Sequence, residues 1–195
     1  MSDFVIFDTE FEWNRSNNPY PPRPDTVFEV IQIGALRIRR ADYAIIDKLN
    51  ILICPRLNPC LSPYFCTLTG ITAEAIAREG LAFEEAASRF MTFCGTAPAF
   101  AYGDDAGLFI RNAQLVGTRL PPAWPNTRVS NIGPWFSSLN SKLATVNSGA
   151  LARTLGLSLD NEAEEMGEHN ALYDCYSIHV AMKHLVATHS AVIPK

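Results

Sequence analysis

Basic residues are scarce in this sequence, and their scarcity limits the partners that it suits. Its 195 residues include 16 lysines and arginines against 20 aspartates and glutamates, for a formal net charge of −4. A protein that wraps duplex nucleic acid usually presents a basic face, so the acidic balance argues against a broad nucleic-acid scaffold. It leaves open a protein that holds only the end of a strand, through metal ions bound by its own carboxylates.

Long apolar runs and paired cysteines are also missing. No stretch approaches the length needed to cross a bilayer, and the N-terminus has no basic segment before its apolar residues. The five cysteines are an odd number with no CxxC pair, which favours free thiols in a reducing compartment over disulfides or a zinc site. We therefore expect a cytoplasmic protein with no membrane segment.

The composition that remains is ordinary for a globular protein. Hydrophobic residues make up 48% and charged residues 18% of the chain, and a chain of this length suits one domain better than two. We expect a single domain over residues 1–195. A proline-rich loop insert is expected at about residues 13–26, because clustered prolines forbid regular structure.

The hydrophobic pattern predicts both strands and helices. Predicted strands cover residues 4–7, 27–39, 43–53, 97–102 and 129–136. Predicted helices cover residues 71–79, 83–93, 105–117, 148–157 and 170–186. Ser148 is a candidate cap for the fourth of these helices, and residues 55–63 are expected to form a turn-rich connection. Three strands followed by strand–helix alternation predict an α/β domain with a mixed sheet.

Asp8 and Glu10 follow the first predicted strand and are two residues apart. The period of a strand places both side chains on one face of the sheet. Adjacent carboxylates raise each other's pKa unless a cation lies between them. The pair therefore suits a metal site, and it equally suits polar residues that close a strand, because short acidic motifs often occur by chance.

His169 and Asp174 form a second candidate pair. Their spacing of five does not place both on one helical face, but it suits a histidine before a helix and an aspartate one turn inside it. Gly167 allows a flexible entry just before the histidine. The alternative is a surface histidine and an aspartate favoured by the helix dipole, which leaves the first pair unexplained.

The Asp104–Asp105 doublet is the third acidic feature, and either residue suits a cap of the following helix. On that helix, Asp105 shares the face of Phe109, which is expected to pack on the sheet. Asp104 shares a more mixed face with Leu108 and Arg111. We therefore assign Asp105 to the site and Asp104 to capping or support.

These segments together supply four carboxylates and one histidine: Asp8, Glu10, Asp105, Asp174 and His169. Hard oxygen ligands suit Mg²⁺ or Mn²⁺. Two such ions about 4 Å apart stabilise the attacking and leaving oxygens of a phosphoryl displacement. A neutral histidine takes the proton from an attacking water, because the usual pKa of histidine lies close to working pH. The set predicts metal-dependent phosphodiester hydrolysis.

Five segments, FDTE, EVIQIGA, LTGIT, YGDD and EHNALYD, occur in this order between residues 7 and 174. In this order and spacing they resemble the motifs of the DnaQ-like, DEDDh-type 3′→5′ exonucleases. That superfamily includes RNase T, polymerase proofreading subunits and the Eri-type RNA exonucleases, and the loop insert and LTGIT are most similar to the Eri branch. The YGDD segment differs from many relatives, which have His-Asn or Trp-Gly before the aspartate, so the choice within the doublet stays open.

The resemblance implies an RNase-H-like fold with a central mixed five-stranded sheet flanked by helices. It also implies two catalytic divalent ions, Mg²⁺ or Mn²⁺, with His169 as the general base. The implied metal ligands are Asp8, Glu10, Asp105 and Asp174.

The resemblance further implies that three residues hold the terminal nucleotide, namely Phe11, Leu68 and Thr69. Trp13 is a candidate for stacking on a base. Ordinary packing is the alternative for Leu68 and Trp13. Glu29, at the start of the second strand, is interpreted as structural or as support for the site.

The expected function is hydrolysis of single-stranded nucleic acid from its 3′ end, which releases nucleoside 5′-monophosphates, with RNA slightly favoured over DNA. One alternative is a non-catalytic RNase-H-like module that binds nucleic acid or has a regulatory role, although the sequence has lost none of the acidic positions. Another alternative treats FDTE as the nucleophile motif of an aspartate-based phosphatase. Such a motif has a second aspartate two positions after the first, and this sequence has Glu10 there, which counts against this alternative. The sequence does not distinguish a monomer from a homodimer.

Overall fold

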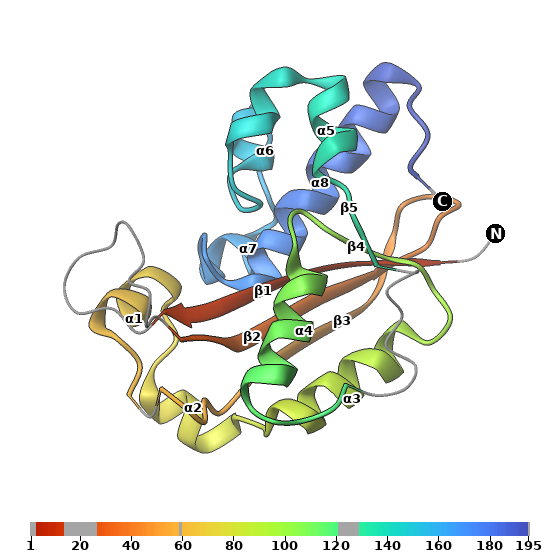
Figure 1. The fold of residues 1–195 in the computed structure, drawn as a ribbon. Coiled ribbons are helices and arrows are strands. Elements are labelled where there is room, and N and C mark those ends of the chain that lie inside the picture. Colours follow the sequence, from red (N-terminus) through yellow and green to blue (C-terminus); the bar gives the residue numbers. More distant parts are fainter. Residues whose placement is uncertain (1–2, 14–26, 59, 121–128, 195) are drawn as a thin grey trace.

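The computed structural model describes residues 3–13, 27–58, 60–120 and 129–194. Its centre is a five-stranded mixed sheet with helices on both faces (Figure 1). This architecture confirms the fold expected from the sequence. The loop insert expected at about residues 13–26 lies outside the described residues except for Trp13, which instead ends the first strand.

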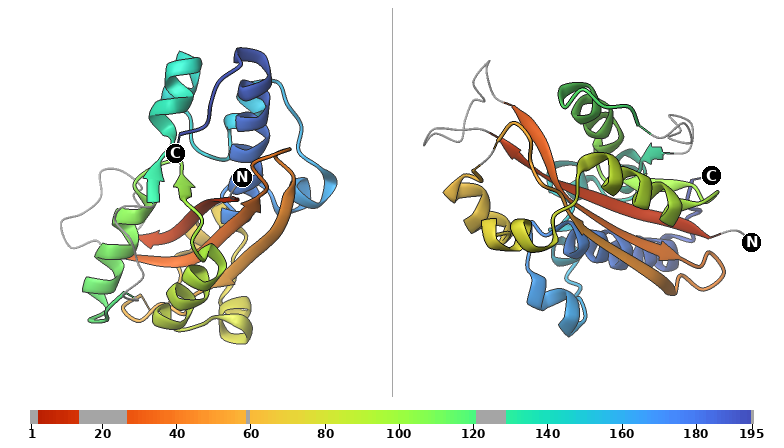
Figure 2. Two further views of the ribbon diagram at one scale, coloured as in Figure 1. Left: turned by 90° about the vertical axis from the view of Figure 1, so that its right-hand side faces the viewer. Right: turned by 90° about the horizontal axis from the view of Figure 1, so that it is seen from below.

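The sheet has the strand order β3-β2-β1-β4-β5, so β1 is at its centre. The first three strands pair antiparallel, whereas β4 runs parallel to both β1 and β5. The strands are β1 (Phe4–Trp13), β2 (Phe28–Ile38), β3 (Ile45–Leu52), β4 (Ala99–Ala101) and β5 (Val129–Asn131). Figure 2 shows the twist that the sheet accumulates from strand to strand.

Each face of the sheet is covered by its own helices. The helices are α1 (Pro63–Thr69), α2 (Ala73–Glu79), α3 (Phe83–Cys94), α4 (Asp105–Leu115), α5 (Gly133–Leu139), α6 (Leu151–Thr154), α7 (Asn161–Met166) and α8 (Ala171–His189), with a 3₁₀ helix η1 (Ser141–Thr145). The α8 side holds α5 to α7, and the other side holds α3 and α4 (Figures 1 and 2). No helix in the described ranges is both long enough and apolar enough to span a membrane.

The central strand is apolar on both faces because both faces are covered. Phe4 and Ile6 pack in the core beneath α8, whereas Val5 and Phe7 pack in the core beneath α3 and α4. All four side chains are fully buried, and each contributes about 1.5–3 kcal/mol through burial. This packing explains the unbroken apolar run with which β1 begins.

Three sequence predictions of regular structure are wrong in part. The predicted strand over residues 129–136 ends at Asn131, because Pro134 lies in the first turn of α5 and its fixed φ suits a helix. Of the helix predicted over residues 148–157, only α6 is helical. Its N-cap residue is Ala150 rather than Ser148. The first strand extends well beyond its predicted end, through Trp13.

Besides α5 and the 3₁₀ helix η1, two short α-helices were missed. The first, α1, falls in and after the segment that was predicted to be a turn-rich connection. Ser62 accepts a hydrogen bond from the Phe65 amide at 3.1 Å, Pro63 takes the first helical position, and Gly70 ends the helix with a φ of 71°. The second, α7, begins after Asp160, whose side chain accepts from the Ala163 amide.

Candidate active site

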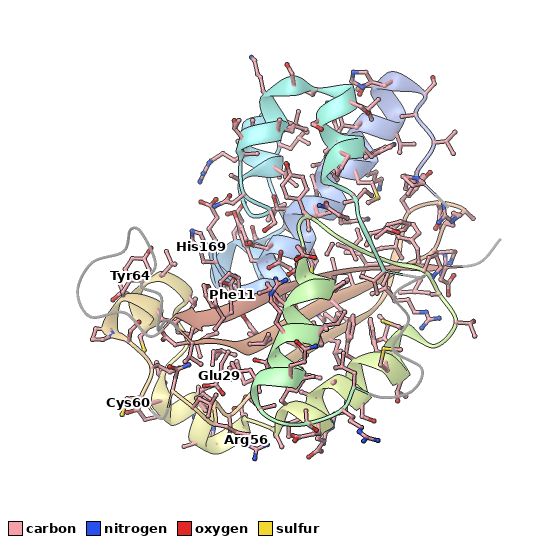
Figure 3. All side chains as sticks on the ribbon, viewed as in Figure 1. Phe11, Glu29, Arg56, Cys60, Tyr64 and His169 are labelled. Carbon is pink, nitrogen blue, oxygen red and sulfur yellow. The ribbon has the colours of Figure 1, made fainter. Side chains whose placement is uncertain are left out.

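The predicted site residues meet at a cavity of about 650 Å³ beside the second half of β1. Its walls come from β1, α1, the start of α4, residues 146–148 and the first turn of α8. Figure 3 shows Phe11 of β1, Tyr64 of α1 and His169 of the loop before α8 at the same end of the sheet.

Three carboxylates form the closest group at this cavity. Asp8, Glu10 and Asp174 each offer an oxygen that lies within 4.8 Å of the oxygens of the other two. Asp8 and Asp174 are buried, and Glu10 is partly buried. The alternation of β1 therefore puts the first pair on one face, as the spacing predicted, and α8 adds Asp174 from the same side.

The approach of α8 to the sheet depends on two residues of β2 that pair with the acidic residues of β1. Gly34 is the partner of Asp8 in the strand register, and a Cβ at Gly34 would lie 2.3 Å from the carbonyl carbon of Ala171. Gln32 is the partner of Glu10, and its Oε1 accepts a hydrogen bond from the Ala171 amide at 2.9 Å. The first turn of α8 is thus fixed directly against the carboxylates of β1.

The carboxylate of Asp174 is oriented by the loop before α6. Ser148 Oγ donates to Asp174 Oδ2 at 2.8 Å, and the His169 amide donates to Asp174 Oδ1 at 3.3 Å. A Cβ at Gly149 would lie 2.5 Å from Asp174 Oδ1. Ser148 was predicted to cap a helix, but its hydroxyl instead holds the aspartate at the mouth of the cavity.

Asp105 reaches the same cavity from the opposite layer. It is 6% exposed, and its Oδ1 accepts a hydrogen bond of 2.6 Å from Thr9 Oγ1. The side chain of Asp104 is 72% exposed and forms an ion pair with Arg111 at 3.0 Å. Both aspartates line the cavity, and Asp105 is the buried one, although it lies outside the tight group of three.

Burial raises the pKa of all four carboxyl groups. Burial is the main cause at Asp8, whose pKa is raised well above its usual value, and the charges of Asp105, Asp174 and Glu10 add to it. The pKa of Glu10 is also raised well above its usual value, first by burial and then by Asp174 and Asp105. Burial raises the pKa of Asp174 to about 7 and that of Asp105 to about 6 against the hydrogen bonds that each accepts.

This arrangement fits a divalent metal. Among the residues that the structure describes, no lysine or arginine lines the cavity or forms an ion pair with these four carboxylates. Buried like charges without a counterion are unfavourable, and oxygen-only donors are the set that Mg²⁺ and Mn²⁺ prefer. A bound cation would lower all four pKa values and remove the repulsion.

His169 lines the cavity from the loop that precedes α8. Its φ of 65° lies in the left-handed region, which a residue with a Cβ occupies at a cost of about 1–2 kcal/mol. The same backbone conformation directs the His169 amide at Asp174. Strain of this kind is concentrated at functional sites.

The residues expected to hold a nucleotide divide into two groups. Phe11 and Leu68 line the cavity. Thr69 does not: it is buried, and its hydroxyl donates to the Phe65 carbonyl at 2.9 Å and accepts from the Ile71 amide. Thr69 therefore shapes the end of α1 rather than the cavity wall. The side chain of Trp13 lies outside the described part of the chain.

Tyr64 and Tyr102 are among the cavity residues that the sequence analysis missed. Tyr64 lies one helical turn before Leu68 on α1 and is 56% exposed. The Ser-Pro signal at residues 62 and 63 marks the start of this helix and would have placed it. Tyr102, directly after β4, donates a hydrogen bond to the Leu143 carbonyl. The sequence shows that Tyr102 lies between the fourth strand and the acidic doublet. It does not show that the tyrosine contacts Leu143, 41 residues later.

A mixed sheet with helices on both faces, joined to a cluster of four carboxylates of which three are buried, defines a metal-dependent nuclease of the RNase-H-like fold. A family model described as an exonuclease, that of RNase T, matches residues 5–180. The chain therefore belongs to this exonuclease family and is a hydrolytic enzyme, in agreement with the resemblance to DEDDh exonucleases. No curated protein matches the sequence.

Several solved structures share the fold. The nuclease domain of 3′hExo, a DEDDh family member bound to rAMP, has 18% identity and a TM-score of 0.76, with coverage of 95% of this chain and 92% of that domain. Cell-death related nuclease 4 has 18% identity and a TM-score of 0.73, with coverage of 95% of this chain and 64% of the other.

Exonuclease I of E. coli, bound to single-stranded DNA, has 17% identity and a TM-score of 0.66. This chain spans 42% of that protein and 61% of a full-length 3′-exonuclease. At these identities the likeness establishes the fold.

Proposed function

We propose that this protein is a 3′→5′ exonuclease that hydrolyses the terminal phosphodiester bond of single-stranded nucleic acid and releases nucleoside 5′-monophosphates. The observation that carries the proposal is the group of four carboxylates around one cavity, three of them buried, that no lysine or arginine of the described residues neutralises. Its partner is the 3′ end of a strand, and the proposed exonuclease domain spans residues 1–195.

In this proposal two divalent ions, Mg²⁺ or Mn²⁺, are held by Asp8, Glu10, Asp105 and Asp174. Bound there, they would offset the negative charge of the scissile phosphate and stabilise the attacking and leaving oxygens. The carboxylates must lose their protons to act as ligands. Ser148 and the His169 amide keep Asp174 turned toward the cavity.

His169 is the proposed general base. Its imidazole lines the cavity and would accept a proton from the attacking water. The water oxygen then bonds to phosphorus, the bond from phosphorus to the 3′ oxygen of the preceding nucleotide breaks, and that oxygen takes a proton. The products are a nucleoside 5′-monophosphate and a strand with a new 3′ hydroxyl.

The apolar wall of the cavity suits the terminal base. Phe11 and Leu68 line it, and Tyr64 adds an exposed ring. Stacking of a base on an aromatic side chain is worth about 1–3 kcal/mol and depends little on base identity. We therefore propose that these three residues hold the terminal nucleotide whatever its base.

Similar structures support a strand end as substrate and favour RNA slightly. The 3′hExo domain was solved with rAMP, which is a nucleoside monophosphate, and another 3′-exonuclease structure concerns the histone mRNA stem-loop. Both have a TM-score of 0.76, against 0.66 for exonuclease I with single-stranded DNA.

Digestion of matched 5′-labelled RNA, single-stranded DNA and duplex tests the function. With Mg²⁺ or Mn²⁺, we expect a ladder of progressively shorter labelled strands, fastest with single-stranded RNA, and no ladder with EDTA. Asp8→Asn and His169→Ala should abolish the ladder, whereas His189→Ala, at the far end of α8, should not.

Two results would count against these assignments. A full ladder from His169→Ala would exclude histidine as the general base. Tight oligonucleotide binding without metal-dependent shortening by the wild-type protein would instead indicate a non-catalytic binding module.

A further inference from the structure

A second cavity, of about 220 Å³, adjoins the active-site cavity on the side of α4. The two share Phe11 and Leu108 as walls, so they lie side by side. We call the second cavity the Arg111 groove, which is lined chiefly by Phe11, Phe28, Val30, Leu108, Arg111 and Leu115.

One stripe of α4 forms a wall of this groove without packing on the sheet. Phe109 on the other face is fully buried, whereas Leu115 is 40% exposed. The spacing of Leu108, Arg111 and Leu115 repeats along one side of the helix. The stripe thus combines a half-buried leucine, an exposed leucine and one guanidinium. Single-stranded nucleic acid contacts such a combination through its bases and phosphates.

Arg111 is also the one lysine or arginine among the described residues that line the two cavities. Its guanidinium forms an ion pair with Asp104 at 3.0 Å, and the two side chains are 58% and 72% exposed. Exposed ion pairs of this kind are weak. A phosphodiester offers the guanidinium a better partner, because arginine binds phosphate oxygens through two parallel N–H donors.

We propose that the Arg111 groove binds the nucleotides on the 5′ side of the scissile bond, with Arg111 on a backbone phosphate and Leu108, Leu115 and Phe28 against sugar and base. This inference rests on the proposed function, since it extends the same strand from the active-site cavity. It explains how an acidic protein retains a polyanion: a guanidinium stands in the groove that adjoins the carboxylate cavity.

Arg111→Gln tests the groove through two substrates that differ in length. Thymidine 5′-monophosphate p-nitrophenyl ester has no nucleotide on the 5′ side, whereas a single-stranded oligonucleotide has several. We expect the KM for the oligonucleotide to rise about tenfold while kcat/KM for the ester stays within about twofold. The salt dependence of binding should also fall by about 0.7 in logarithmic slope, the loss of one phosphate contact on a single strand.

Arg89→Gln is the matched control, because Arg89 forms a comparable exposed ion pair on α3 with Glu85 and lies outside the groove. Arg89→Gln should change neither the KM for the oligonucleotide nor the kcat/KM for the ester. Equal losses with both substrates for Arg111→Gln would overturn the groove and indicate a role inside the active site. No change with either substrate would also overturn it.

Binding of a fluorescent oligonucleotide, with Ca²⁺ in place of Mg²⁺, tests the groove independently of turnover. Arg111→Gln and Leu115→Glu should each weaken binding several-fold relative to wild type, and Arg89→Gln should not. If the wild type hydrolyses neither substrate, the proposed function fails, and this binding series still decides the groove. Equal affinity of wild type and both groove variants would refute it.

Discussion

In the described part of the chain, two regions that bury carboxylates differ in how the negative charge is compensated. On β2, Glu29 is 2% exposed and accepts hydrogen bonds from the backbone amides of Arg56, Leu57 and Asn58 at 2.7, 2.9 and 2.6 Å. The side-chain amide of Asn58 adds a fourth, at 2.9 Å. Figure 3 shows Glu29 and Arg56 together, away from the active-site cavity.

At that cavity, by contrast, carboxylates face each other. Asp8, Glu10 and Asp174 present oxygens to one another, and the described residues place no lysine or arginine on them. A carboxylate surrounded by amides stabilises a loop, whereas a group of carboxylates without a counterion is costly until a cation binds. Burial is common to both regions, so the partners distinguish a structural acid from a functional one.

The largest expected effect is on catalysis. Asp8→Asn removes a proposed metal ligand, and each such electrostatic contribution is worth about 10²–10³-fold in rate, so we expect activity to fall by about 10³-fold or more. The same change removes repulsion, so the metal-free protein should unfold at an equal or higher temperature than wild type. Initial rates and thermal denaturation in EDTA measure the two effects.

The control for this variant is Asp47→Asn, on an exposed stretch of β3. It should leave both activity and stability unchanged. If Asp8→Asn instead lowered the thermal midpoint in EDTA, the result would contradict the claim that the cavity carboxylates destabilise the metal-free protein.

The opposite pattern is expected at Glu29. In Glu29→Gln, the amide group cannot accept all the hydrogen bonds that the carboxylate accepts, and loss of charge-assisted hydrogen bonds costs about 1.5–3 kcal/mol of unfolding free energy. Catalysis should remain within about twofold of wild type. Urea denaturation and initial rates check this, and a variant that keeps full stability but loses activity would show that Glu29 belongs to the site.

Stability without metal should depend on pH. Asp174 and Asp105 have raised pKa values of about 7 and about 6 in the folded protein against 3.8 ordinarily. They bind protons more tightly when folded, so their contribution to stability is fully present below the unfolded pKa and is lost as pH rises through the folded values. Metal-free protein should therefore lose stability between about pH 4 and pH 7.

Metal should reverse this trend. Deprotonated carboxylates bind it, so added Mn²⁺ should raise the thermal midpoint more at about pH 8 than at about pH 6. At a concentration of 100 times the dissociation constant, the rise should be about 5–10 °C. Thermal denaturation at both pH values measures it, and a larger rise at the lower pH would contradict the proposed ligands.

The smallest effect is expected at Ser148. Ser148→Ala removes the donor to Asp174, and loss of a residue that orients a metal ligand typically weakens metal affinity by about 10–100-fold; we expect the lower end. Isothermal titration with Mn²⁺ measures the affinity, and Ser148→Thr should restore it. Equal affinity in Ser148→Ala would show that the hydroxyl only fills space.

Much of this structure could be predicted from the sequence, because the spacing of residues along a strand or helix determines which side chains share a face. Alternation placed Asp8 and Glu10 together on β1, and helical spacing separated Asp105 from Asp104. The site that these residues share was predicted from their chemistry and from a family resemblance. What failed were short elements, since α1 and α7 have too few residues for a period to show and depend on caps instead.

Contacts between distant segments were not readable. Ser148 precedes a short helix and suits a cap, but its hydroxyl bonds to a residue 26 positions later. The role of Gly34 also depends on packing, because only the approach of Ala171 requires a residue without a side chain there. The spacing of residues along the chain does not predict such contacts between distant segments.

The most direct test of the central claim is digestion of a 5′-labelled RNA in H₂¹⁸O with Mn²⁺, followed by mass spectrometry. The account predicts nucleoside 5′-monophosphates that carry one ¹⁸O on the phosphate, shortened strands with a 3′ hydroxyl, and neither product from Asp8→Asn. Products with a 3′-terminal phosphate, or the same products from Asp8→Asn, would contradict it.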